Sequence, residues 1–130
     1  MRTRIALAVL ASLAVGLGSA SAATLRDGTY NCIAGSIRYG TATTPGQIEI
    51  RGATFRFHES GKPNDQPFSG YTLNADRTIT WHGPMGFMTK NGNTIEITHL
   101  DGVAQDSFWF RPDLKGMPPQ EAVSCGLVTH

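Results

Sequence analysis

Short alternations of apolar and polar residues run through the chain from about residue 28 onward, and no stretch keeps a helical period. The clearest pair covers residues 48–50 and 55–57, where isoleucine and phenylalanine alternate with polar residues on either side of Arg51-Gly52-Ala53. A period of two predicts half-buried β-strands. Because Gly52 can take a positive φ in a tight turn, the two strands are predicted to form a hairpin with one apolar face.

The same pattern predicts several further short strands. They cover Tyr30–Cys32, Ile37–Tyr39, Tyr71–Leu73, Ile79–Trp81, Thr94–His99, Asp106–Arg111 and Gln120–Cys125. Asn74-Ala75-Asp76-Arg77 is predicted to turn the chain between Tyr71–Leu73 and Ile79–Trp81, which makes these two strands a second hairpin. The Asn91-Gly92 pair is typical of a type I′ hairpin turn, whereas the polar run 59–67 predicts a surface loop. About eight short strands predict an all-β fold, a single small antiparallel β-barrel or sandwich.

Two of these strands carry more specific predictions. Phe108-Trp109-Phe110 places aromatic rings on both faces of its strand, so this strand is expected to be central or shielded on its outer side. The last strand, ending at Cys125, is expected to return beside the first and bring Cys125 to Cys32. Closing a barrel in this way also removes exposed edges.

The N-terminal segment has the features of a secretory signal peptide. Arg2 and Arg4 precede an apolar and small run of 13 residues from Ile5 to Leu17, and Ala20-Ser21-Ala22 is a typical cleavage site. The run is shorter than the roughly 18–20 residues of a membrane anchor. Residues 1–22 are therefore predicted to be removed, leaving a single β domain over residues 23–130 that is soluble and either periplasmic or secreted.

Cys32 and Cys125 are the two cysteines of the chain and both lie in the predicted mature part. An exported domain folds where disulfides persist, so a Cys32–Cys125 bond is predicted. The alternatives are two free thiols or a bond to another chain. A bridge spanning 125 − 32 = 93 positions would stabilise the domain by roughly 4–5 kcal/mol in the chain-entropy model.

Charge argues against a nucleic-acid partner. The chain has 11 basic and 10 acidic residues, and removal of Arg2 and Arg4 changes this to 9 against 10. No basic stripe of the kind that contacts phosphates is present.

No catalytic or metal-binding motif stands out. The histidines His58, His82, His99 and His130 lack paired spacing such as His-x-His, and His99 shares the parity of Ile95 and Ile97. No serine lies in a Gly-x-Ser-x-Gly elbow. The carboxylates of Glu49 and Glu96 alternate with isoleucines and should face solvent. We therefore expect a protein that is not an enzyme and has no metal and no cofactor.

The segment from Gly83 to Met88 is apolar where its turn residues predict a loop. Met85, Phe87 and Met88 are its large side chains. They have two alternative interpretations, an exposed loop that contacts a partner or a plug that fills one end of the barrel.

Two resemblances follow from the motifs. Gly28-Thr29-Tyr30-Asn31-Cys32, Gly70-Tyr71-Thr72-Leu73, Ile79–Pro84 and Ser124-Cys125 resemble small exported bacterial β-proteins, mostly of unassigned function. Tyr30-Asn31-Cys32, Ser69-Gly70-Tyr71 and Cys125 are also similar to the MliC-type periplasmic inhibitors of C-type lysozyme. That resemblance implies a small β-barrel whose Ser-Gly loop enters the lysozyme cleft, with Ser69, Gly70 and Lys90 as candidate partner-binding residues.

Two functional hypotheses remain. The first is an exported, non-enzymatic binding protein, with inhibition of a lysozyme-type hydrolase as one version and Ser69, Gly70, Met85, Phe87, Met88 and Lys90 as the candidate partner-binding residues. The second is a lipocalin-like barrel that holds a small apolar ligand. Its motivation is the aromatic content of the strands, namely Phe55, Phe57, Tyr71, Trp81, Phe108 and Phe110.

Overall fold

A computed structural model describes residues 23–35, 40 and 42–128. The predicted signal peptide over residues 1–22, the predicted strand Ile37–Tyr39 and His130 lie outside the described residues.

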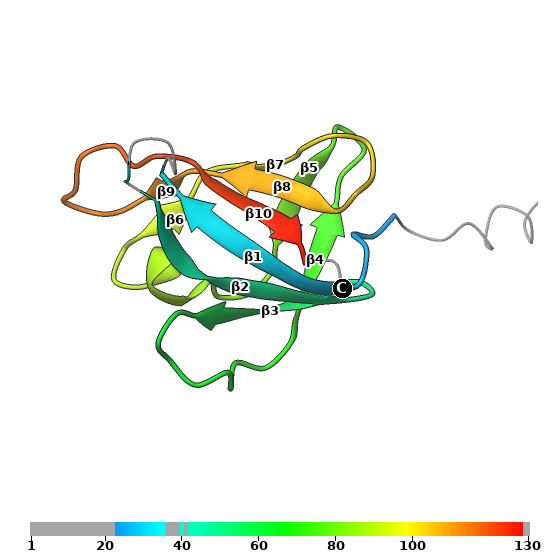
Figure 1. The fold of residues 1–130 in the computed structure, drawn as a ribbon, viewed down its shortest axis with the longest axis horizontal. Helices are drawn as coiled ribbons and strands as arrows, with labels where there is room; N and C mark the ends of the chain where they lie inside the picture. Colours follow the sequence, from blue (N-terminus) through cyan, green and yellow to red (C-terminus); the bar gives the residue numbers. More distant parts are fainter. Residues whose placement is uncertain (1–22, 36–39, 41, 129–130) are drawn as a thin grey trace, which may run out of the picture.

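Eight strands close into an antiparallel barrel, which confirms the predicted all-β fold class (Figure 1). Around the barrel the order is β1-β10-β8-β7-β5-β4-β3-β2, and β6 and β9 form a separate two-stranded ribbon. The strands are β1 Gly28–Ala34, β2 Thr43–Arg51, β3 Thr54–Glu59, β4 Ser69–Leu73, β5 Thr78–Trp81, β6 Thr94–Ile95, β7 Thr98–Leu100, β8 Ser107–Phe110, β9 Pro112–Asp113 and β10 Val123–Leu127. One short 3₁₀ helix, η1 Gly86–Thr89, lies at the end of the barrel opposite residues 23–27, which precede β1 (Figure 1).

The first predicted hairpin is present as β2 and β3. Ile50 lies opposite Phe55 and Ile48 opposite Phe57, and all four side chains are buried. Gly52 has φ +56° in the two-residue connection, a conformation that glycine adopts without a steric penalty. The alternation of apolar and polar residues and the glycine in the turn therefore suffice to predict this hairpin from neighbouring residues alone.

The second hairpin, β4 and β5, is also confirmed, with Tyr71 opposite Trp81 and Leu73 opposite Ile79. Its turn is held by the Asp76 carboxylate, which accepts hydrogen bonds from the hydroxyl and the backbone N–H of Thr78 at 2.6 and 3.2 Å. These bonds hold the pKa of Asp76 below its ordinary value, because they favour the charged form.

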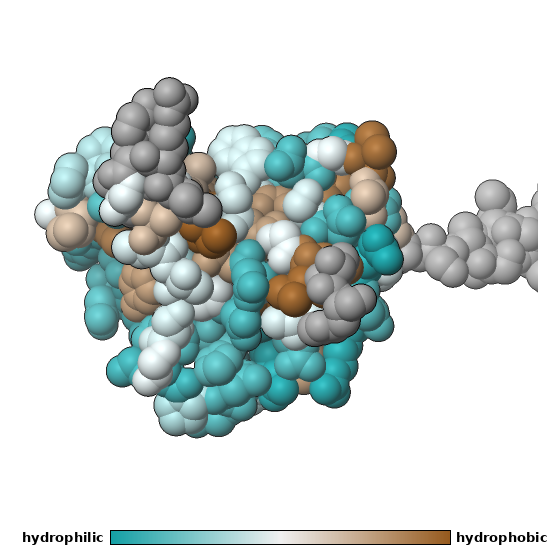
Figure 2. All heavy atoms as spheres, viewed as in Figure 1, coloured by the Kyte–Doolittle hydropathy of each residue, from teal (hydrophilic) through white to brown (hydrophobic). Residues whose placement is uncertain are grey.

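Aromatic rings fill the interior of the barrel. The Trp81 ring packs against Phe55, Tyr71 and Phe108, with centroid distances of 4.7, 5.7 and 5.3 Å. These partners come from β3, β4 and β8, so Trp81 joins strands far apart in the sequence. On the outside, the face drawn in Figure 2 is mostly hydrophilic, with hydrophobic residues in small separate spots.

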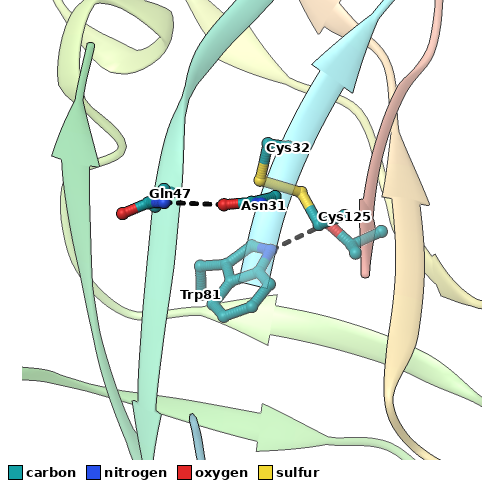
Figure 3. The surroundings of a disulfide bond; sticks show 6 residues. Asn31, Cys32, Gln47, Trp81 and Cys125 are labelled. Atoms are coloured by element: carbon teal, nitrogen blue, oxygen red, sulfur yellow. Dashed lines mark hydrogen bonds between the residues drawn. A yellow bond between two sulfur atoms is a disulfide. The ribbon is translucent and has the colours of Figure 1, made fainter. Parts of the chain in front are cut away.

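The predicted disulfide joins the first and last strands of the barrel. Cys32 in β1 lies directly opposite Cys125 in β10, with a Cα–Cα distance of 4.0 Å, and both side chains are buried (Figure 3). The last strand thus returns beside the first, as predicted, although it covers Val123–Leu127 rather than Gln120–Cys125. A disulfide is typical of proteins that fold in an oxidising, exported environment.

The predicted strand Thr94–His99 is wrong in one respect, because its alternation is interrupted. Ile95 pairs with Pro112, and Leu100 pairs with Phe108. Between these two pairs the segment that contains Ile97 advances by 100 − 95 = 5 residues, whereas the segment paired with it advances by 112 − 108 = 4 residues. The extra residue is a β-bulge, and it falls at Ile97. Glu96 before it still donates its N–H to the carbonyl oxygen of Arg111 at 2.8 Å.

The bulge reverses the direction of the side chains that follow it. Ile97 is 65% exposed, whereas Thr98 is fully buried. His99, whose parity with Ile95 predicts an inward side chain, instead stacks on Trp109 outside the barrel at a centroid distance of 4.7 Å. That contact shields one side of Trp109, so the outer ring of β8 is covered as expected.

The Asn91-Gly92 turn has the predicted backbone but does not connect a hairpin. Both residues have positive φ, 57° and 86°, as a type I′ turn requires. However, the turn joins η1 to β6, and β6 pairs with β9 instead of with the preceding segment.

Candidate functional site

The apolar segment around η1 closes one end of the barrel. Met85 and Met88 are fully buried, so the plug interpretation is confirmed for both and the exposed-loop interpretation is wrong for both. Phe87, between them in the sequence, is 39% exposed. The buried methionines and the exposed Phe87 point in different directions because a 3₁₀ helix has three residues per turn.

Hydrogen bonds fix the backbone on which Phe87 is carried. The Phe87 N–H donates to Oε1 of Glu59 at 2.8 Å, and the Phe87 carbonyl oxygen accepts from the side-chain amide of Asn93 at 2.8 Å. The hydroxyl of Thr89 accepts from the N–H of Met85 at 2.8 Å. These hydrogen bonds therefore hold in place the backbone that carries the exposed Phe87 ring.

An open apolar cleft of about 460 Å³ lies on one side of Phe87. It is lined by Ala34, Gly35, Thr43, Thr44, Pro45, Phe87, Met88, Pro112, Leu114, Gln120, Glu121 and Val123. These residues come from the end of β1, the start of β2, η1, the β9 region and the approach to β10. Glu121 is the one charged residue among the described residues that line the cleft.

A smaller depression of about 330 Å³ lies on the other side of Phe87 and has mixed charge. Its charged lining consists of Glu59, Lys62, Asp65 and Lys90. The predicted partner-binding residues Phe87 and Lys90 therefore line the same depression. Phe87 thus lies between the apolar cleft and the charged depression.

Ser69 and Gly70 do not form a projecting loop. Both lie in β4, where Ser69 is opposite Phe55 and Gly70 opposite Thr54. A Cβ on Gly83 would clash with the Ser69 hydroxyl, so Ser69 packs tightly against Gly83 in the segment after β5. Neither Ser69 nor Gly70 lines the cleft or the charged depression.

The described histidines lie in separate places. His58 bonds through Nε2 to the carbonyl oxygen of Lys62, and His82 bonds through Nε2 to the hydroxyl of Thr72, each at 2.8 Å. His99 stacks on Trp109. Within residues 23–35, 40 and 42–128, no group of three or more His, Cys, Asp or Glu side chains could hold a metal ion.

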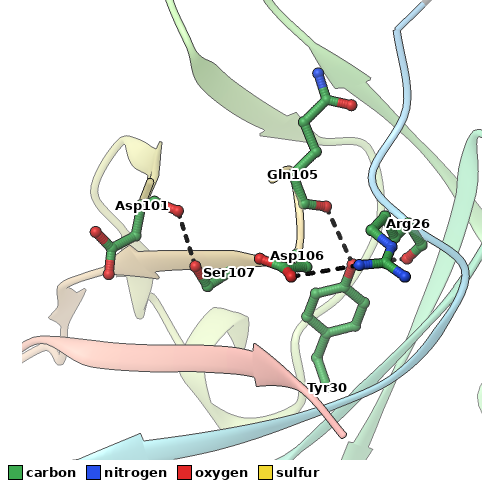
Figure 4. Close-up of polar contacts among 6 residues, drawn as sticks. All are labelled: Arg26, Tyr30, Asp101, Gln105, Asp106 and Ser107. Carbon is green, nitrogen blue, oxygen red and sulfur yellow. Dashed lines mark hydrogen bonds and ion pairs between the residues drawn. The ribbon is translucent and has the colours of Figure 1, made fainter. Parts of the chain in front are cut away.

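The opposite end of the barrel is closed by buried tyrosines together with Leu25 and Arg26. The Tyr30 hydroxyl donates to the carbonyl oxygen of Arg26 at 2.6 Å, beside the ion pair of Arg26 with Asp106 (Figure 4). The Tyr71 hydroxyl donates to the carbonyl oxygen of Gly52 at 2.7 Å and accepts from the N–H of Leu25 at 2.8 Å. Burial raises the pKa of both phenols, so they stay neutral and structural.

Comparison of the chain with protein-family models, with curated proteins and with solved structures finds no match in any of the three. Among the described residues no helix is both long and apolar enough to span a membrane. Function therefore has to be argued from the geometry of the barrel.

Several residues of the cleft carried no signal in the sequence. Pro45, Leu114 and Val123 belong to three segments that come together only in the closed barrel. Pro112 and Leu114 lie in a stretch whose composition predicts a loop, although Pro112–Asp113 forms β9. Glu59, which fixes the Phe87 backbone, looks in the sequence like the start of a solvated loop.

Proposed function

We propose that this protein is an exported, non-enzymatic binding protein, periplasmic or secreted, that holds an apolar side chain of a protein partner in the cleft beside Phe87. The single observation that carries the proposal is the position of Phe87. It is a large apolar ring held exposed between an apolar cleft and a charged depression. Exposed aromatic residues beside a pocket are typical of binding surfaces.

The chemistry of the cleft defines the kind of group it can accept. Phe87, Met88 and Leu114 supply apolar contacts, while Thr43, Thr44 and Gln120 can form hydrogen bonds. Because the exposed Glu121 is the charged group of the lining, a neutral or cationic occupant is favoured over an anionic one. An apolar side chain followed by a lysine or arginine would satisfy both requirements.

The packed interior favours a site at the mouth of the barrel over a lipocalin-like site inside it. Three of the rings that motivated the ligand hypothesis, Phe55, Tyr71 and Phe108, contact a fourth, Trp81. The cleft volume of about 460 Å³ lies within the range of ligand sites. We favour a protein partner over a small molecule because the surface continues past Phe87 into the charged depression.

Inhibition of a lysozyme-type hydrolase is a narrower version of this function. The resemblance on which it is based assigns the contact to Ser69 and Gly70, which here are paired strand residues. If the protein inhibits lysozyme, we therefore expect the contact to be made by Phe87 and its neighbours.

The test is a comparison of baits purified after export: wild type, Phe87→Ala and Val103→Ala. Val103 is 90% exposed and lies in the segment 101–105, which contacts Arg26 at the opposite end of the barrel, so it is a matched control for loss of an exposed apolar side chain. A protein from the producing organism's surroundings should be retained by wild type and Val103→Ala. Phe87→Ala should bind it at least about tenfold more weakly.

Equal retention by Phe87→Ala, or no retained protein, would contradict the proposal. Two further measurements test the hydrolase-inhibitor version of the proposal and the alternative of a small apolar ligand. Loss of lysozyme inhibition in Phe87→Ala, with inhibition kept in Val103→Ala, would support the hydrolase version. A small apolar molecule that copurifies with the exported protein and is seen by native mass spectrometry would instead favour the ligand hypothesis.

A further inference from the structure

The bulge at Ile97 creates a second surface, away from the cleft. Ile97 is 65% exposed because it is the one residue that the pairing between 94–100 and 107–113 leaves out. Bulges commonly redirect a side chain at a functional position. Here the redirected side chain is a large β-branched apolar one, and its burial against a partner would be favourable.

Ile97 lies in an apolar and aromatic setting on the outer wall. A shallow depression of about 490 Å³ is lined by Glu96, Ile97, His99, Trp109 and Arg111. His99 and Trp109 stack with an interplanar angle of 22°, which holds both rings in place. The depression is on the outer face of the β6–β9 ribbon, because Arg111 is exposed whereas the adjacent Pro112 is buried and lines the apolar cleft.

Two exposed side chains of opposite charge flank this apolar surface. Glu96 and Arg111 are neighbours across the ribbon, since the Glu96 N–H donates to the Arg111 carbonyl oxygen at 2.8 Å. Neither belongs to an ion pair among the described residues, whose pairs involve Arg26, Arg51 and Arg56. One acid and one base therefore stand side by side next to Ile97.

We propose that this face, defined by Glu96, Ile97, His99, Trp109 and Arg111, is where a second copy of the chain packs. A two-fold axis running along the ribbon, between Glu96 and Arg111, places Glu96 of each copy over Arg111 of the other. It also brings the Ile97 and Trp109 side chains of the two copies together. Two-fold contacts require a surface that is complementary to itself, and an apolar centre beside one acid and one base meets that requirement.

A partner surface that carries charges of one sign only fits this face less well. A partner surface of uniform sign would face either Glu96 or Arg111 with a like charge, which is unfavourable. The face is small, so the dimer is expected to be weak, as is typical of interfaces below about 1,200 Å². The cleft beside Phe87 lies on the other face of the ribbon and stays open in this dimer.

Charge reversal provides the test. Sedimentation equilibrium of the exported protein should show a monomer–dimer equilibrium. Glu96→Arg and Arg111→Glu should each raise the dimer dissociation constant at least about tenfold, because each creates two like-charge contacts per dimer. The double variant Glu96→Arg/Arg111→Glu should restore the constant to within about threefold of wild type, because the opposite charges again face each other.

Two serine variants test the apolar centre. Ile97→Ser should abolish the dimer, while the control Val103→Ser, at another exposed apolar position outside this face, should not. Thermal unfolding of each variant checks that it is folded. A wild type that stays monomeric at every concentration, or a double variant that dimerises no better than the single ones, would overturn the proposal. Phe87→Ala should leave the dimer unchanged, so this test and that of the proposed function fail independently.

Discussion

The indole N–H of Trp81 donates a hydrogen bond to the hydroxyl of Thr98 at 2.8 Å inside the barrel. Thr98 is the one fully buried polar residue among those described, and it faces inward because the bulge at Ile97 shifts the alternation by one position. Without that shift an isoleucine would occupy this interior position and the indole would lose its acceptor. The one extra residue at the bulge therefore gives the indole N–H of Trp81 its hydrogen-bond acceptor and leaves Ile97 exposed.

Thr98→Val should destabilise the protein by about 1–3 kcal/mol, because it keeps the shape of the side chain but leaves the Trp81 N–H without a partner. Thr98→Ser is the matched control, since it keeps the hydroxyl and gives up one methyl group, worth about 1 kcal/mol. Urea unfolding followed by tryptophan fluorescence measures both. The hydrogen bond would be unimportant if the valine variant were as stable as the serine variant.

Removal of the disulfide through Cys32→Ala/Cys125→Ala should lower the free energy of unfolding by about 2–5 kcal/mol. The physical reason is that the bridge joins residues 93 apart and restricts the unfolded chain. Urea unfolding of the double variant and of the reduced wild type should give similar midpoints, both below that of the oxidised protein. Equal midpoints with and without the bond would contradict the expectation.

Met88→Ala and Phe87→Ala should differ in stability although the residues are neighbours. Met88 is fully buried, so its truncation should cost about 2–5 kcal/mol through lost contacts and a cavity. Phe87 is 39% exposed, so its truncation should cost less, about 1–2 kcal/mol. Thermal unfolding of both variants checks this. A large loss in Phe87→Ala would mean that the ring is structural and not available to a partner.

Alkaline pH should destabilise the protein through its buried tyrosines. Tyr30 and Tyr71 have pKa values raised above the ordinary 10.0, chiefly because burial disfavours the phenolate. Above about pH 10 the unfolded chain therefore loses protons that the folded protein keeps. Their contribution is fully present below pH 10 and decreases as the pH rises further. Urea unfolding from about pH 8 to about pH 11 should show the decrease, and Tyr30→Phe should reduce its slope.

The hairpins β2–β3 and β4–β5 were predictable because their determinants are local. Alternation at Ile48–Phe57 assigns the buried face, and Gly52 permits the turn without reference to the rest of the chain. The disulfide was predictable for a different reason, since a chain with two cysteines has only one internal pairing. Tertiary structure was needed for Met85 and Met88, because an apolar segment with turn residues is compatible with both a plug and an exposed loop.

By itself the sequence determined the all-β class, the two main hairpins and the cysteine pairing, since each depends on the parity of nearby residues or on a simple count. Only the tertiary structure decided which way Ile97 and Thr98 point, because a bulge is visible only when both paired segments are compared. It also decided that Phe87 stands beside a cleft built from five distant segments. Such a site depends on barrel closure, which brings together residues with no shared local pattern.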